Sequence, residues 1–265
     1  MEIKKELIRG IWRSDVYYQM AKKGSLDTNH PGMRALFNLR EGATNILDLG
    51  CGEGSRLNLV TGSKYKGTGI DISSTAIRLA KKNFPKLTFF QGDLERTQFR
   101  DNSFDLVYSA YVLEHLNNPT KILSEAIRLT ARDGYLVLIA PNYGAPNRCS
   151  PPFKGSRLIK FIIGLLKDLF SLFNLHQTLD WTQVKPIGDE KNYNIDWDTT
   201  IEPYIGSLLI FLKKKNMKIR EFNSCWSEEL KIAKTHQKVF RFLGELGLYP
   251  FLMWGPHLVV IAQKV

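Results

Sequence analysis

The chain has 265 residues, of which 43% are hydrophobic and 24% are charged, a balance that can build the core of one large α/β domain. The formal net charge of +11 leaves two interpretations open: an anionic partner (nucleic acid, a phosphorylated substrate or an acidic membrane surface) or a lysine-rich solvated surface. Three scattered cysteines, Cys51, Cys149 and Cys225, include no CxxC pair and argue against a zinc cluster or a disulfide framework.

The start of the chain, MEIKKELIRGIW, lacks the apolar core of a signal peptide, which predicts a reducing, cytoplasmic compartment. The most apolar stretch, residues 157–175, is interrupted by Lys160, Lys167 and Asp168. Its longest charge-free run is too short to span a bilayer.

Strands and helices are predicted to alternate between residues 44 and 141. Ser73 is a predicted helix cap, and Asn118 with Pro119 predicts another helix start. Such alternation favours a doubly wound, mostly parallel sheet, whose ligands bind at the carboxyl ends of the strands. The predicted strands are 44–50, 65–71, 87–93, 104–110 and 134–141, and the predicted helices are 55–62, 73–84 and 118–130.

A glycine turn follows the first predicted strand, in the stretch NILDLGCGEGS at residues 45–55. Glycines allow the backbone to approach a ligand closely, although GxGxG is not the dinucleotide fingerprint GxGxxG. Acidic residues stand near three successive strand ends, at Asp48, Asp71 and Asp93. A carboxylate at Asp71 can accept hydrogen bonds from two ribose hydroxyls, and one at Asp93 from an exocyclic amino group. Each acid is, alternatively, a simple helix cap.

Together these motifs resemble the class I S-adenosylmethionine-dependent methyltransferases, in their small-molecule branch. ILDLGCGEGS resembles the first motif of that family, GIDIS its ribose acid and GDLE its adenine contact, and the resemblance covers roughly residues 40–142. It implies S-adenosyl-L-methionine as cofactor, S-adenosyl-L-homocysteine as product, and a seven-stranded sheet completed by residues 217–225 and 257–265. The implied cofactor contacts are Gly50, Cys51 and Gly52 at the methionine part, Asp71 at the ribose, Ile72 at the adenine face, Asp93 and Leu94 at the adenine edge, Ser109 facing the methyl donor, and Asp48 orienting the glycine loop near the amino group.

The fourth strand is followed by SAYVLEHL, where enzymes of this fold that methylate base amino groups carry [N/D]-P-P-[Y/F]. By resemblance, this favours an oxygen or carbon atom of a small-molecule, glycan or lipid-linked acceptor. His115 is the candidate general base, or else a structural histidine, and Glu114 is equally ambiguous. The alternatives are an RNA or protein methyltransferase, or a cofactor-binding scaffold without chemistry of its own.

We expect a single domain over residues 1–265, either a monomer or a homodimer, built from an N-terminal helical cover (1–40), a cofactor-binding core (41–142), an insertion (143–200) and the rest of the sheet (201–265). The helix in the insertion has a polar line and a wide apolar face. It is predicted to be a lid over the acceptor pocket or a contact with a partner subunit, or alternatively a basic amphipathic helix on a membrane surface. Other candidates are Trp12, Tyr17 and Tyr18 as cover or core, His176, Trp181 and Trp197 as pocket wall or core, and Asp198 as the cap of a helix near Glu202.

Overall fold

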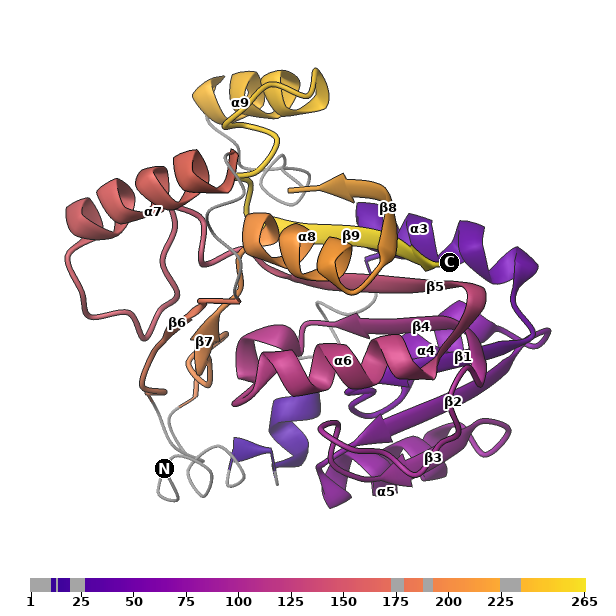
Figure 1. Ribbon diagram of the computed structural model, residues 1–265. Coiled ribbons are helices and arrows are strands. Elements are labelled where there is room, and N and C mark those ends of the chain that lie inside the picture. Colours follow the sequence, from indigo (N-terminus) through magenta and orange to yellow (C-terminus); the bar gives the residue numbers. More distant parts are fainter. Residues whose placement is uncertain (1–10, 13, 20–26, 173–178, 188–192, 225–234) are drawn as a thin grey trace.

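The computed structural model describes residues 11–12, 14–19, 27–172, 179–187, 193–224 and 235–265. Its centre is a seven-stranded sheet of order β3-β2-β1-β4-β5-β9-β8, with helices on both faces (Figure 1). β9 runs antiparallel to both of its neighbours, β5 and β8, whereas the other strand pairs of this sheet are parallel, so the predicted α/β class and the mostly parallel sheet are confirmed. The strands are β1 (Asn45–Leu49), β2 (Lys66–Asp71), β3 (Thr88–Gln91), β4 (Phe104–Ala110), β5 (Thr130–Pro141), β8 (Met217–Asn223) and β9 (His257–Lys264).

Side-chain caps begin two of the helices as the sequence predicts. The Ser73 hydroxyl accepts a hydrogen bond from the Ala76 amide, and the Asn118 side chain accepts one from the Lys121 amide. The helices are α3 (Pro31–Leu39), α4 (Ser55–Thr61), α5 (Ser74–Asn83), α6 (Pro119–Leu129), α7 (Arg157–Leu172), α8 (Ile205–Lys214) and α9 (Thr235–Glu245), with 3-10 turns η1 (Arg40–Gly42) and η2 (Leu113–His115).

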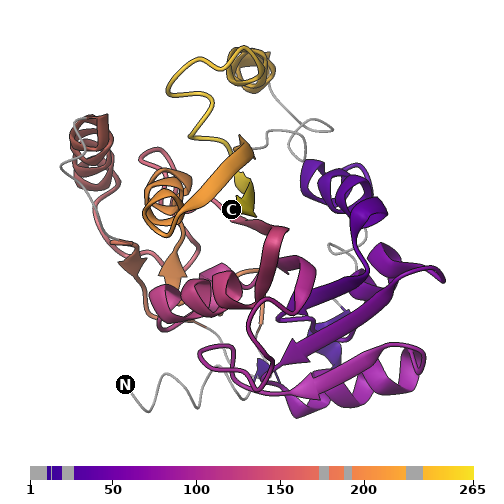
Figure 2. The same ribbon diagram turned by 45° about the vertical axis from the view of Figure 1, so that its right-hand side comes forward.

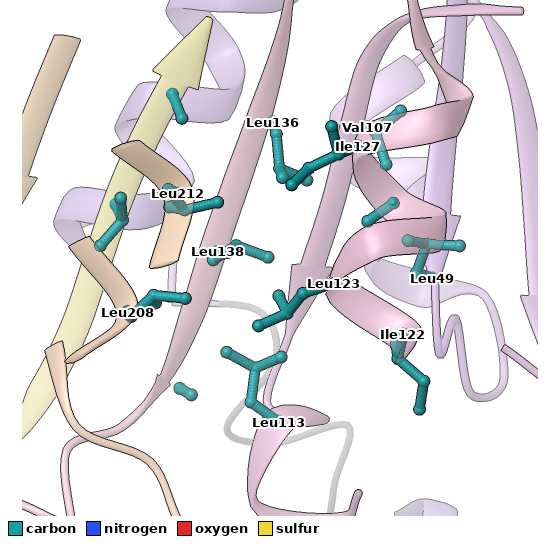
Figure 3. Close-up of a cluster of buried hydrophobic side chains, with 14 of the residues drawn as sticks. Leu49, Val107, Leu113, Ile122, Leu123, Ile127, Leu136, Leu138, Leu208 and Leu212 are labelled. Carbon is teal, nitrogen blue, oxygen red and sulfur yellow. The ribbon is translucent and has the colours of Figure 1, made fainter. Parts of the chain in front are cut away.

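Alternate residues of the central strands point to two separate cores. Leu47 and Leu49 of β1 pack with α6 and α8 on one face, in the cluster drawn in Figure 3. Ile46 faces the other core, which α3, α4 and α5 cover. A strand buried on both faces reads as a continuous apolar run, which explains why β1, β4 and β5 are easily predicted from the sequence.

The insertion after β5 holds α7 and a small two-stranded sheet, β6 (Thr182–Gln183) with β7 (Ile201–Glu202). Figure 2 shows α7 at the periphery of the molecule. Among the described side chains of α7, Asp168 is buried and Lys160 is 10% exposed, whereas most of the apolar side chains are exposed. No helix in the described part of the chain is long and apolar enough to cross a membrane.

Candidate active site

A cavity of about 820 Å³ lies beyond the carboxyl ends of β1, β2 and β4. Its described lining comes from the glycine loop, the turns after β2, β3 and β4, the segment around residues 12–18, and residues 193–196 of the insertion. Most predicted cofactor residues lie on it: Gly50, Cys51, Gly52, Asp71, Ile72, Asp93 and Leu94 all line the cavity.

The glycine loop is shaped by backbone angles that favour glycine. Gly50 has φ of 80°, and a Cβ atom there would lie 2.4 Å from Cγ2 of Val112. Gly54 has φ of 85° and precedes the first residue of α4. The amides of Gly50 and Cys51 donate to the Ile70 carbonyl at 2.8 and 3.1 Å, which ties the loop to the end of β2.

Asp71 organises this end of the cavity. Its carboxylate accepts hydrogen bonds from the amides of Gly52 and Ser73, at 2.9 and 2.8 Å. Burial raises the pKa of this carboxyl group, and the two amides oppose the rise. Asp93 accepts from the Glu95 amide at 2.9 Å, so it also stabilises its own turn.

Two predicted residues do not line the cavity. The Ser109 hydroxyl is buried and donates to the Leu49 carbonyl at 3.0 Å, so the expectation that Ser109 faces the methyl donor is not met in this arrangement. The reason is geometric: Ser109 lies within β4, and the cavity begins at Ala110. Asp48 is fully buried and accepts from the Tyr108 hydroxyl at 2.8 Å.

Asp48 is electrostatically unusual. Its Oδ1 atom has no hydrogen-bond partner, and burial raises the pKa of the carboxyl group to about 7, although Arg56 and the Tyr108 hydroxyl oppose the rise. Arg56 lines the cavity, donates to the Ala110 carbonyl at 2.9 Å, and keeps a buried Nε without a partner.

A buried carboxylate, Asp198, holds the cover of the cavity together. It accepts from Trp12 Nε1 at 3.0 Å, from the Tyr17 hydroxyl at 3.3 Å and from the Tyr193 hydroxyl at 3.0 Å. These partners come from two distant segments, and all three line the cavity. Tyr18 also lines the cavity, but it is buried and its hydroxyl donates to the Trp12 carbonyl at 3.1 Å. Asp198 does not cap α8, which begins at Ile205 after Tyr204.

Glu114 and His115 reach the cavity from η2. His115 Nδ1 lies 3.3 Å from the Asp198 carbonyl oxygen, and its Nε2 lies 3.8 Å from Glu114 Oε1. Burial lowers the pKa of His115, but Asp198 and Glu114 outweigh it, and the net shift is upward. Glu114 is 1% exposed with Oε2 unpartnered, and burial raises its pKa to about 7 against the opposing effect of His115.

Residues 47–138 match the family model described as "Methyltransferase domain". The chain contains a class I S-adenosylmethionine-dependent methyltransferase domain. The cofactor of this domain family is S-adenosylmethionine.

Two relatives resemble this chain over little more than a third of its length. The Bacillus subtilis protein named "Putative 23S rRNA (guanine-N(1)-)-methyltransferase YxjB" is 39% identical over 104 residues, which are 37% of this chain and 34% of that protein. Demethylmenaquinone methyltransferase of Renibacterium salmoninarum is 31% identical over 93 residues, which are 35% of this chain and 39% of that protein. The chain thus spans between a third and two fifths of the length of these relatives.

Solved structures extend the likeness to most of the chain at the level of the fold. An S-adenosylmethionine-dependent methyltransferase from Mesorhizobium loti superimposes with a TM-score of 0.57 at 18% identity, covering 88% of this chain and 96% of that one. This likeness shows the same fold and leaves the acceptor open.

The cavity of the methyltransferase domain is acidic, although the whole chain is basic. Arg56 is the one lysine or arginine among the described lining residues. The carboxylates of that lining are Asp27, Glu53, Asp71, Asp93, Glu95, Glu114 and Asp196. Such a cavity attracts cations and repels phosphates.

Several site residues escape prediction from the sequence. Arg56, Tyr193 and Asp196 line the cavity, and the Tyr143 hydroxyl donates to Asp196. In the sequence, the acidic DWD segment at residues 196–198 is the pattern that could have indicated Asp196 as a site residue. Of the predicted wall residues, Trp181 is core and donates to the Ser207 hydroxyl at 2.8 Å, Trp197 is absent from the lining, and His176 lies outside the described residues.

Proposed function

We propose that this protein transfers a methyl group from S-adenosylmethionine to an oxygen or carbon atom of a small-molecule, glycan or lipid-linked acceptor. The observation that carries the proposal is the shared cavity: the glycine loop, Asp71, Asp93 and Glu114 all line the same space. Its volume of about 820 Å³ is within the range of small-molecule sites and leaves room for an acceptor beside the cofactor.

The residues present fit the cofactor. Asp71 keeps acceptor capacity for the ribose hydroxyls, while Ile72 and Leu94 offer apolar surface to the adenine ring near Asp93. The guanidinium of Arg56 lines the cavity and suits a carboxylate, so we assign the methionine part to this end. Asp48 is fully buried outside the lining, and its predicted role is to orient the glycine loop. When bound, the cofactor supplies an activated, electrophilic methyl group.

The protein's own contribution to transfer is alignment, exclusion of water and control of one proton. Trp12, Tyr17 and Tyr193, held by Asp198, cover the cavity and limit its exchange with solvent. We assign proton removal from an acceptor hydroxyl to Glu114, because its free Oε2 and its pKa of about 7 are those of a general base at neutral pH. His115 is the weaker candidate for the base, since its raised pKa favours the protonated form.

The charge of the cavity supports a neutral acceptor over nucleic acid. Seven carboxylates against Arg56 form a poor environment for a phosphate backbone. RNA remains the alternative acceptor because the Bacillus subtilis relative is named for rRNA methylation and because the chain carries a net charge of +11. An RNA acceptor predicts binding that weakens steeply with salt, whereas salt-independent behaviour counts against it. The cytoplasmic location also stays a prediction.

The test gives the purified protein methyl-labelled S-adenosylmethionine with an extract of its host cells, and separates lipid, polysaccharide, protein, RNA and small-molecule fractions. We expect label in the small-molecule, polysaccharide or lipid fraction, and its loss in Asp71→Ala together with at least about a 100-fold loss of cofactor affinity by calorimetry. Asp105→Ala is the matched control, because Asp105 also accepts from two backbone amides, those of Thr44 and Asn45 at 2.8 and 2.9 Å, but near the opposite ends of the strands.

Label in RNA or protein would overturn the proposed acceptor class and leave the methyltransferase activity standing. If the protein binds the cofactor but no fraction is labelled, the result would favour the alternative that it is a cofactor-binding scaffold without chemistry of its own. Failure of the wild-type protein to bind the cofactor would overturn the proposed function itself.

A further inference from the structure

Helix α7 (Arg157–Leu172) is attached to the body of the protein through its polar side. Lys160, Gly164 and Asp168, spaced by four residues, form one stripe along the helix. Lys160 is 10% exposed and its Nζ lies 2.6 Å from Glu202, which is itself fully buried. At Gly164, a Cβ atom would lie 2.6 Å from Cγ of Pro146, so the backbone of α7 approaches the body closely there.

The second anchor of the polar stripe is Asp168. It is 7% exposed, and its carboxylate accepts from the Tyr204 hydroxyl at 2.6 Å, the Tyr249 hydroxyl at 2.9 Å and Trp254 Nε1 at 3.1 Å. Rotating α7 to bury its apolar side would leave Asp168 and Glu202 without these partners. The observed orientation is therefore imposed by buried charges.

The opposite side of α7 is apolar and faces solvent. The residues Leu158, Ile159, Ile162, Leu166 and Leu169 are between 46% and 68% exposed. None of the described lining residues of the cavity belongs to α7, so the helix is not the cavity's lid. A contiguous exposed apolar surface of this kind marks an interaction site.

The charge around α7 distinguishes between the possible occupants. Residues 148–172 carry five cationic side chains and one acidic side chain, the buried Asp168. Lys160 is paired with the buried Glu202 and Lys167 with Asp180, both from outside this range, whereas Lys154 and Arg157 are exposed, so the exposed charge of the segment is positive. Two copies of such a face repel each other, whereas a surface of anionic phospholipids attracts it. The five cations are Arg148, Lys154, Arg157, Lys160 and Lys167.

We propose that α7 lies on an anionic phospholipid bilayer, with Leu158, Ile162 and Leu166 inserted at the level of the headgroups and Lys154 and Arg157 near lipid phosphates. Its 16 residues make a helix about 24 Å long, shorter than the hydrocarbon core of a bilayer, so it lies in the plane of the surface. This inference does not depend on the identity of the methyl acceptor.

The test is flotation of the full chain with vesicles of phosphatidylcholine containing a quarter phosphatidylglycerol, and with vesicles of phosphatidylcholine alone. We expect flotation with the anionic vesicles, weaker flotation with the neutral ones, and a loss of at least about tenfold in partitioning for the double variant Ile162→Glu with Leu166→Glu. Lys82→Glu on α5 lowers the net charge by the same two units at an exposed position in another part of the molecule, and it should float nearly as well as the wild type.

Circular dichroism and cofactor binding by calorimetry establish that the variants are folded, because α7 does not line the cavity. Equal partitioning of the double variant and the wild type, or no flotation of the wild type, would overturn the proposal. A wild-type dimer in sedimentation analysis that the double variant abolishes, without vesicle binding, would assign the same face to a second copy of the chain.

Discussion

At the scale of single residues, the cavity depends on carboxylates that are placed for different tasks. Asp71 accepts a hydrogen bond from a backbone amide at each carboxylate oxygen and shapes the loop that it contacts. Glu114 has an oxygen with no partner at all, although it is almost fully buried. A buried carboxylate oxygen without a hydrogen bond destabilises the fold unless a ligand donates to it. We therefore infer that Glu114 is kept for binding or catalysis.

The pH dependence of transfer tests the role of Glu114. Burial raises the pKa of this carboxyl group to about 7, so the basic form becomes populated as pH rises through that value. For an acceptor that must lose a proton, we expect the rate to rise with pH and to level off above about 7, and Glu114→Gln to remove this limb and slow transfer by about 10² to 10⁴-fold. The measurement is kcat/KM between pH 5 and 9.

Glu53→Gln is the matched control, because Glu53 also lines the cavity but its carboxylate is occupied by the hydroxyl of Ser55 at 2.6 Å. We expect the Glu53→Gln variant to keep the rise of kcat/KM with pH. If kcat/KM of the Glu114→Gln variant rises with pH as it does in the wild type, another group is the base.

At the scale of elements, buried charges join α7 to the rest of the insertion. Glu202 of β7 accepts from the amide and hydroxyl of Ser150 at 2.8 and 2.9 Å, and from Lys160 of α7. A buried ion pair contributes little relative to an apolar pair of the same shape, but removing one partner leaves an isolated buried charge.

We expect Lys160→Met to destabilise the insertion by about 3 kcal/mol, because Glu202 then stays buried without its cation. Hydrogen exchange of the α7 amides measures this loss of protection. Lys167→Met is the control on the same helix, since Lys167 is 37% exposed and its pair with Asp180 is partly solvated. Equal protection in the two variants would contradict the role of the buried pair.

At the scale of the whole molecule, Asp198 joins segments that are far apart in the chain. Trp12 and Asp198 are 186 residues apart, yet the indole of Trp12 donates to this carboxylate at 3.0 Å. With His115 beside it, Asp198 connects the N-terminal segment, the insertion and the turn after β4.

We expect Asp198→Ala to open the cover: hydrogen exchange of the amides in residues 14–19 should rise, and KM for the cofactor should increase about tenfold or more, because three hydrogen bonds to a charged group are lost. Asp15→Ala is the control, since it removes only the exposed ion pair with Arg78 at 2.9 Å. An unchanged exchange rate in Asp198→Ala would show that the cover does not depend on this carboxylate.

The sequence by itself determined the sheet, the glycine loop and the strand-end acids, because these are local patterns that parallel topology brings to the same edge. An apolar run makes β1, the turn residues follow it directly, and Asp71 and Asp93 reach the same cavity by the same rule. The resemblance of this part of the chain to a methyltransferase domain followed from that local information.

Only the tertiary structure decided which side of α7 meets the protein and which residues cover the cavity. Periodicity reveals that Lys160, Gly164 and Asp168 share a side of the helix. It does not reveal that Lys160 pairs with the buried Glu202 or that Asp168 accepts from Trp254. The same limit applies to Asp198, whose partners lie in distant segments, and to Ser109, whose position within β4 turns its hydroxyl to Leu49. Long-range contacts depend on how the elements pack, and a pattern in the sequence records only which residues lie side by side on one element.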